Sequence, residues 1–350
     1  MKARFALLFL LLPLSVHAVR ISVLPEVPLI ERGRSAQILN FDFLVENDGT
    51  VPATIEQIEM SVIRADGALV LQRRLAENGD SISTVPQRTI EPGAKIVIFN
   101  PFYELPDDVA LTTLRYEFAI AGAQPVVVDV HPRVYRPMSE LTLPLGGRVF
   151  VHDGHDFYSH HRRLDITGGM TTALHIDTNM TRFAYDFCVV DEQGRMHSGT
   201  GEKPEEWFGF GKPILAPADG VVVKAINTAP DHAQFHPDLE QVLADVLTIG
   251  GNYVVVDHGN GEHSAFMHMK QGSVAVKPGD RVKRGQKIGE MGWSGDAIFP
   301  HLHYQLQRDN YVGEGLPSYF RDAARFNGTA FVPAKNGQID TGDIVMKRER

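Results

Sequence analysis

The first third of the chain alternates short β-rich runs with polar turns, and helical periodicity is weak there. The runs are ISVLPEV (21–27), AQILNFDFLVEN (36–47), ATIEQIEMSVIRADG (53–67), ALVLQRRLA (68–76), KIVIFNPF (95–102) and TTLRYEFAIAG (112–122). Turn sequences such as NDGT (47–50) and EPGA (91–94) separate them at spacings typical of antiparallel sandwiches. The pattern predicts an immunoglobulin-like β-sandwich over residues 19–124, with no histidine and no visible catalytic cluster.

The second half returns to β-rich runs after a proline-containing connection. Prolines recur through residues 125–144, which we expect to link two domains. Beyond them, glycine-punctuated runs predict a second, antiparallel β domain over residues 145–350; they are PILAPADGVVVKAI (213–226), NYVVVDHGNGEHSAFMHM (252–269), SVAVKPGDRVKRGQKIGEMG (273–292) and PHLHYQLQ (300–307). Two inserts, 191–210 and 230–244, interrupt this pattern, and the second favours a short helix at PDLEQVLADVL. The fold class predicted for the whole chain is therefore mainly β.

The N-terminus has the pattern of a secretory signal. Residues 1–18 combine the basic Lys2 and Arg4 with an apolar run over 5–16 and a small residue, Ala18, where a signal peptidase could cut. The run is shorter than the roughly 20 residues that a membrane span needs, and no other stretch approaches that length. We expect an exported protein, periplasmic or on the cell surface, with no membrane span in the mature chain.

Composition and charge narrow the classes of function. The 350 residues suggest two domains, and 43% of them are hydrophobic, as in ordinary globular proteins. With 34 basic and 43 acidic side chains the formal net charge is −9, and no long basic run is present, so nucleic acid is not an expected partner. The single cysteine, Cys188, excludes an internal disulfide and is expected to be a buried apolar residue.

Histidine is concentrated in the second half, where 13 of the 15 histidines lie between His152 and His303. If PHLHYQLQ is a strand, its period of two places His301, His303 and Gln305 on one face. The other face carries the apolar Leu302, Tyr304 and Leu306. Because the apolar set must face a core, the register is specified and the two imidazoles are held rigidly, as a metal or catalytic site requires.

Further candidate ligands lie upstream of that strand. His268 lies in the strand-like run SAFMHMK, and the segments YSHHRRLDI (158–166) and TRFAYDF (181–187) supply more histidines and carboxylates. The latter candidates are His160, His161, Asp165 and Asp186, with His175 between the two segments. Catalytic zinc takes three protein ligands and keeps one open position, and two histidines with one carboxylate form a common set.

The order of these motifs resembles the lysostaphin-type zinc peptidases, the M23 or LytM family. The matching motifs are HRR, FAYDF, GKPILAPADGVV, GNYVVVDHGNGEHSAFMHM, VKPGDRVKRGQKIGEMGWSG and PHLHYQ, which span about 145 to 310. Members of this family cleave peptide bonds in the cross-links or bridges of bacterial peptidoglycan. The resemblance implies an antiparallel lysostaphin-type domain, one Zn²⁺ per chain, and peptidoglycan peptide stems or cross-links as the substrate.

The resemblance also implies the metal ligands. The second histidine of the HxH motif is His303, and Asp186 matches the aspartate of the family's first motif. The histidine of that motif is expected at His161, just before the Arg-Arg pair, with His175 second and His160 third. Asp165 is an alternative to Asp186, because His161 and Asp165 reproduce the compact HxxxD spacing of simpler members.

Two further histidines match the family's catalytic positions. These are His268 and His301, implied to act as general base and as stabiliser of the tetrahedral intermediate, with the division between them open. The stretched first motif and Trp293, where many relatives carry a smaller or polar residue, depart from the family pattern.

Two alternatives to a peptidoglycan endopeptidase stay open. One is a non-catalytic cell-wall-binding or amidase-activator protein with the same fold, and the other is a metallopeptidase with a protein or peptide substrate. The N-terminal module is a candidate site for a protein partner, and it could also occlude the groove of the second domain.

Overall fold

The computed structural model describes residues 18–33, 35–76, 87–157, 159–231, 239–308 and 313–348. The chain forms two compact units that are each discontinuous in sequence. The first unit holds residues up to 26 together with 42–101 and 111–131, and the second unit holds 27–41, 102–110 and 132–350. The domain boundaries expected from the sequence stay a prediction. Of the expected signal, residues 1–18, all but Ala18 lie outside the described part of the chain.

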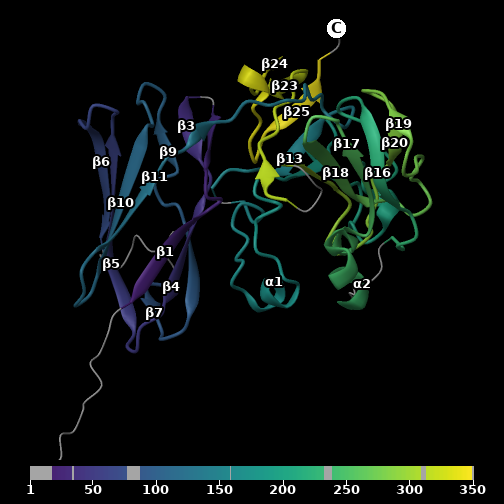
Figure 1. Cartoon of the computed structure of the whole chain (residues 1–350). Coiled ribbons are helices and arrows are strands. Elements are labelled where there is room, and N and C mark those ends of the chain that lie inside the picture. The colour runs from purple at the N-terminus through teal and green to yellow at the C-terminus, as the bar shows by residue number, and fades with distance from the viewer. Residues whose placement is uncertain are drawn as a thin grey trace, which may run out of the picture. The chain divides into compact units, whose positions relative to one another are not determined.

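The first unit consists of two antiparallel sheets (Figure 1). One has the order β1-β4-β8, from Val19–Leu24, Asp42–Asn47 and Lys95–Phe99. The other has the order β11-β10-β5-β6, with β7 on β5, from Val126–Val130, Thr113–Ile120, Ala53–Ile63, Leu69–Ala76 and Thr89–Ile90. The ring of Phe43 on β4 lies 4.8 Å and 5.1 Å from those of Tyr116 and Phe118 on β10, so the two sheets pack against each other. The immunoglobulin-like topology stays a prediction.

The second unit opens with a small four-stranded sheet built from distant segments. Its order is β12-β2-β3-β9, from Arg133–Val134, Leu29–Arg32, Ala36–Leu39 and Glu104–Pro106. Strands β2 and β3 form an antiparallel hairpin, and β12 joins β2 in parallel. Residues 27–41 therefore fold with the histidine-rich half of the chain.

A large sheet of eleven strands dominates the second unit (Figure 1). Its order is β19-β16-β17-β18-β21-β14-β13-β25-β23-β24, with β22 on β21. In the same order the strands are Arg281–Val282, Gly220–Ile226, Asn252–Asp257, Glu262–Met269, Leu302–Arg308, Tyr185–Val189, Val149–Asp153, Ile344–Lys347, Ala323–Phe326, Phe331–Pro333 and, last, Gly315–Leu316. A separate pair joins β15 (Pro213–Leu215) to β20 (Lys287–Glu290). The prediction of a mainly β, antiparallel chain is confirmed.

The two faces of the large sheet have different partners. One face packs into the main core, to which Tyr185, Phe187, Leu302 and Tyr304 contribute fully buried side chains. The other face carries the histidines and, beside them, a smaller apolar cluster that includes Met180, Tyr253 and Met267. The alternation predicted for 300–307 is thus present in β21.

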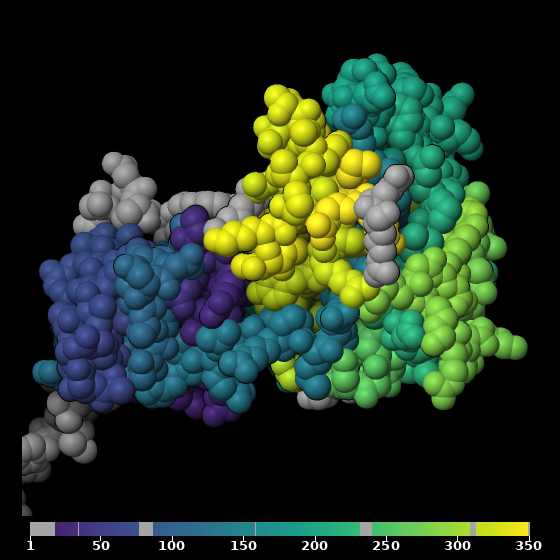
Figure 2. Space-filling model, turned by 90° about the horizontal axis from the view of Figure 1, so that it is seen from above, coloured from purple at the N-terminus to yellow at the C-terminus, as the bar shows by residue number. Residues whose placement is uncertain are grey.

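Short helices lie in the loops of this unit. They are α1 (Gly169–Ala173), α2 (Leu239–Ala244) and the 3₁₀ turns η2 (Pro204–Glu206), η3 (Val246–Gly250) and η4 (Lys335–Gly337). The helix predicted in the second insert is present as α2. The C-terminal segment, yellow in Figure 2, forms part of the surface of the second unit and includes the partly buried β25, which pairs with β13. Within the described residues, no helix is both long and apolar enough to span a membrane.

Candidate active site

The site is built around the contact between two neighbouring strands. Asp186 on β14 is directly paired with His303 on β21, so both side chains project from the same face of the sheet. His303 Nδ1 lies 3.2 Å from Asp186 Oδ1, and both residues are buried. Their neighbours along the strands point into the main core, which fixes the register and therefore this contact.

His161 reaches the same carboxylate from the loop between β13 and α1. Its Nε2 lies 3.1 Å from Asp186 Oδ1, and its ring centroid is 4.6 Å from that of His303. The backbone of His161 is held by Asn179, whose Nδ2 donates to the His161 carbonyl at 3.0 Å. Two histidines from separate segments thus converge on one oxygen of the Asp186 carboxylate.

His301 and His268 lie beside this group. His301, immediately before β21, has its Nε2 3.4 Å from Asp186 Oδ1, and His268 on β18 has its ring centroid 4.6 Å from that of His301. His301 Nδ1–H donates to the carbonyl of Phe299 at 2.8 Å, and His268 Nδ1–H donates to that of Ser294 at 3.0 Å. Because a carbonyl only accepts, both rings carry a proton on Nδ1 and leave Nε2 available for proton transfer.

Gln305 sets the orientation of His303. The Nε2–H of His303 donates to Gln305 Oε1 at 2.8 Å, and Gln305 is almost fully buried. With its proton on Nε2, His303 presents the Nδ1 lone pair to Asp186 and His161. Such a partner on the second nitrogen is the usual way that a protein fixes the tautomer of a metal-binding histidine.

The charge states follow from burial and proximity. Burial alone would raise the pKa of Asp186, but His161 and His301 outweigh it and hold the pKa well below its usual value. Burial lowers the pKa of His161 despite the nearby carboxylate, and burial together with His301 and His303 lowers the pKa of His268 well below its usual value. The site therefore holds an ionised carboxylate with neutral His161 and His268.

His161, Asp186 and His303 fit a zinc ion by their chemistry and spacing. Two neutral imidazole nitrogens and one carboxylate form a donor set typical of catalytic zinc. The buried His161 Nε2 makes no hydrogen bond within the described residues, although it lies near Asp186. Ligand atoms at about 2.0–2.1 Å from a tetrahedral ion lie roughly 3.3 Å apart, close to the 3.1 Å and 3.2 Å contacts on Asp186 Oδ1.

The alternative ligands lie elsewhere or face a different partner. The His160 side chain is 70% exposed and its Nδ1 contacts Asp153, whereas the side chain of His161 is 10% exposed. Asp153 and His160 nevertheless belong, with His161 and Asp186, to a group whose potential ligand atoms lie within 4.8 Å of one another. Asp165 is exposed, and its Oδ1 accepts hydrogen bonds from Thr167. The geometry thus favours His161 and Asp186 over these alternatives.

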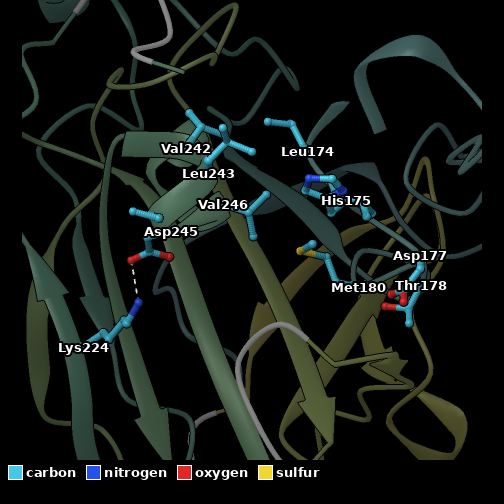
Figure 3. Close-up of a pocket in the computed structure, with 12 residues that line it drawn as sticks. Leu174, His175, Asp177, Thr178, Met180, Lys224, Val242, Leu243, Asp245 and Val246 are labelled. Atoms are coloured by element: carbon cyan, nitrogen blue, oxygen red, sulfur yellow. Dashed lines mark hydrogen bonds and ion pairs between the residues drawn. The ribbon is translucent and has the colours of Figure 1, made fainter. Parts of the chain in front are cut away.

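His175 lines a separate cavity of about 290 Å³ (Figure 3). Leu174, His175 and Met180 lie on one side of it, and residues of α2 and η3 lie on the other. Lys224 and Asp245 form an ion pair of 2.5 Å at its edge. His175 is therefore not part of the group around Asp186.

Two features of the site had no assigned role in the sequence. Gln305 shares a face with His303 by strand periodicity, but only the structure shows its hydrogen bond to His303. Asp296, whose Oδ1 lies 3.9 Å from His268 Nε2, follows Gly295 in a turn whose sequence carries no recognisable signal. Strand periodicity could have suggested the role of Gln305, whereas the position of Asp296 depends on how its loop folds.

Comparison with known proteins identifies one family. Residues 207–313 match the family model described as peptidase family M23. This segment contains His268, His301 and His303, whereas His161 and Asp186 precede it.

Relatives with established names match about a third of the chain. The peptidoglycan DD-endopeptidase ShyA of Vibrio cholerae is 38% identical over 97 residues, which are 28% of this chain and 18% of ShyA. The murein hydrolase activator EnvC of Escherichia coli is 31% identical over 111 residues, which are 32% of this chain and 23% of EnvC. A solved zinc-containing peptidase from Vibrio cholerae has 13% identity and a TM-score of 0.29, with 83% of each chain covered. The chain thus spans less than a quarter of the length of these two curated relatives.

Proposed function

We propose that this chain, which belongs to peptidase family M23, is a zinc-dependent endopeptidase that cleaves peptide bonds in bacterial peptidoglycan. The observation that carries the proposal is the convergence of His161, His303 and His301 on Asp186 Oδ1, at 3.1 Å, 3.2 Å and 3.4 Å. The similarity to ShyA, a peptidoglycan DD-endopeptidase, supports the same substrate class.

The metal would be held by His161, Asp186 and His303. When bound, zinc supplies a Lewis acid that polarises a carbonyl and makes water a nucleophile near neutral pH. Gln305 keeps the Nδ1 lone pair of His303 directed at the site, and Asp186 contributes the negative charge that offsets part of the charge of the cation.

His268 and His301 would perform the proton transfers. Each ring is oriented by a backbone carbonyl at Nδ1, so its Nε2 takes or gives a proton without a change of rotamer. The attacking water needs a base, and the oxyanion that forms from the scissile carbonyl needs a hydrogen-bond donor, so two imidazoles suffice for both tasks. A positioned general acid or base contributes roughly 10²–10⁴-fold to a rate.

The location follows from the substrate. Peptidoglycan lies outside the cytoplasmic membrane, and residues 1–18 have the pattern of a cleaved secretory signal. We therefore place the mature protein in the periplasm or on the cell surface.

A second function is favoured by the similarity to EnvC, a murein hydrolase activator. In that case the domain would bind and activate another hydrolase without cleaving peptidoglycan itself. The buried arrangement of His268 and His301 beside a candidate metal site supports the enzyme over the activator, because an activator has no need for either histidine.

The test is digestion of purified sacculi by the mature protein. Soluble products are separated and identified by mass spectrometry for the zinc-loaded protein, the chelated protein, and the zinc-loaded variant His301→Ala. We expect cleaved peptide cross-links or stems only with the zinc-loaded parent. Intact peptides after prolonged incubation with that parent, together with stimulation of an added amidase, would replace this proposal with the activator function.

A further inference from the structure

A fully buried polar network connects residues 27–41 to the loop that carries His161. Its members are Glu31, Asn40, His155, Arg162 and Tyr185, all at most 3% exposed. Glu31 lies on β2 and Asn40 directly follows β3, more than a hundred residues before the other three. All five belong to the second unit.

Asn40 is the centre of one branch of this network. Its Nδ2 donates to Glu31 Oε1 at 2.7 Å and to the carbonyl of His155 at 2.9 Å. Its Oδ1 accepts from Arg162 Nε at 2.7 Å, and Arg162 Nη2 donates to the carbonyl of Phe41 at 2.8 Å. Because Arg162 follows His161 directly, this branch holds the backbone next to the first candidate ligand.

Glu31 is the centre of the other branch. His155 Nδ1 lies 2.7 Å from Glu31 Oε2, and His155 Nε2 makes a short contact with the hydroxyl of Tyr185. Burial alone would lower the pKa of His155, but the charge of Glu31 outweighs it and raises that pKa. Because Tyr185 directly precedes Asp186, this branch holds the backbone next to the carboxylate ligand.

We propose that Asn40 and Glu31 are positioning residues for the metal site, acting through Arg162 and Tyr185 on His161 and Asp186. The inference rests on the proposed function and adds to it an N-terminal component of the site outside the segment matched by the family model. A buried and satisfied polar network fixes one geometry where an apolar core would allow several. The distance between His161 and Asp186 therefore depends on residues 27–41.

The chain offers a close control for Asn40. Asn47, at the end of β4 in the first unit, is equally buried. Its Nδ2 donates to the carbonyls of Val51 and Ile90, and its Oδ1 accepts from the Gly49 amide. Asn40→Ala and Asn47→Ala thus remove the same number of hydrogen bonds from a buried site, but only the first touches the network.

The experiment measures zinc affinity on the full-length mature protein. The Kd is determined by competition with a chromophoric chelator for the parent, Asn40→Ala, Asn47→Ala and Glu31→Gln, and the visible spectrum of the Co²⁺-loaded proteins reports the geometry. Thermal unfolding shows which variants are folded. If Asn40→Ala does not fold, the test rests on Glu31→Gln. That variant is nearly isosteric with the parent, and its side-chain oxygen still accepts the hydrogen bond from Asn40.

We expect the zinc Kd to rise about 10-fold in Asn40→Ala, as for other residues that orient metal ligands, with a changed Co²⁺ spectrum. Glu31→Gln should weaken binding in the same direction, and Asn47→Ala should lower only the unfolding temperature. This inference alone would be overturned if folded Asn40→Ala had the zinc Kd and the Co²⁺ spectrum of the parent. If Asn40→Ala does not fold, the same result in Glu31→Gln would overturn it. A parent that binds no zinc would overturn the proposed function as well.

Discussion

Replacement of Gln305 by leucine tests how the tautomer of His303 is controlled. Gln305 Oε1 accepts from His303 Nε2 at 2.8 Å, and both side chains are buried. Gln305→Leu keeps the side chain at a similar size but removes the acceptor. The tautomer of His303 that presents Nδ1 to the metal carries its proton on Nε2. In the variant this Nε2–H has no hydrogen-bond acceptor.

The magnitude follows from that loss. An unsatisfied buried donor costs about 1–3 kcal/mol, and loss of the partner of a metal-binding histidine typically costs about 10–100-fold in affinity. A tenfold change corresponds to about 1.4 kcal/mol, so the two ranges agree. We expect the zinc Kd of Gln305→Leu to rise by about 10–100-fold.

Two further variants separate this effect from general destabilisation. Gln307 is also fully buried on β21, and its Nε2 donates to the carbonyl of Gly313, so Gln307→Leu should lower stability without changing the zinc Kd. Gln305→Glu keeps an acceptor and forfeits no donated bond, because Gln305 Nε2 makes no hydrogen bond within the described residues. Its zinc affinity should equal or exceed that of the parent. The zinc Kd is measured by competition with a chelator. Equal zinc Kd values for the parent and Gln305→Leu would refute the role of Gln305 in fixing the tautomer of His303.

Three other predictions concern separate parts of the second unit. His268→Ala and His301→Ala should each retain zinc, measured by mass spectrometry, but slow sacculus digestion by roughly 10²–10⁴-fold; loss of the metal would contradict the role in proton transfer. The raised pKa of His155 contributes stability that is fully present below its ordinary pKa of about 6.5 and is lost as the pH rises through the raised value. The difference in unfolding free energy between the parent and Glu31→Gln should therefore shrink as the pH rises above about 6.5, and a pH-independent difference would count against the ion pair. Burial raises the pKa of the Cys188 thiol, so a thiol reagent should label it only after unfolding, and rapid labelling of the native protein would disprove that.

Strand periodicity was sufficient to predict part of the site. The alternation in 300–307 correctly predicts that Leu302 and Tyr304 enter the core while His303 and Gln305 face the other way, because the pleat forces successive side chains to opposite sides. The buried strand around Asp186 was likewise visible as an apolar run. These features depend on residues near one another in sequence.

The remaining features depend on contacts between distant segments. His160 and His161 are adjacent, and the family resemblance ranked His161 first, but only the packing of their loop shows that the His161 side chain faces Asp186. The same holds for residues 27–41, which resemble their sandwich-like surroundings but fold with the second unit. Asn40 and Arg162 are 122 positions apart, and neither carries a local signal of the hydrogen bond that joins them.

Metal analysis by mass spectrometry tests the central claim most directly. It compares the purified mature protein with His303→Ala and Asp186→Ala, each after reconstitution with zinc and removal of excess metal. The proposed site predicts about one zinc ion per folded parent chain and loss of most of it in both variants. A folded parent that holds no zinc, or variants that hold as much as the parent, would contradict the assignment of His303 and Asp186 as metal ligands.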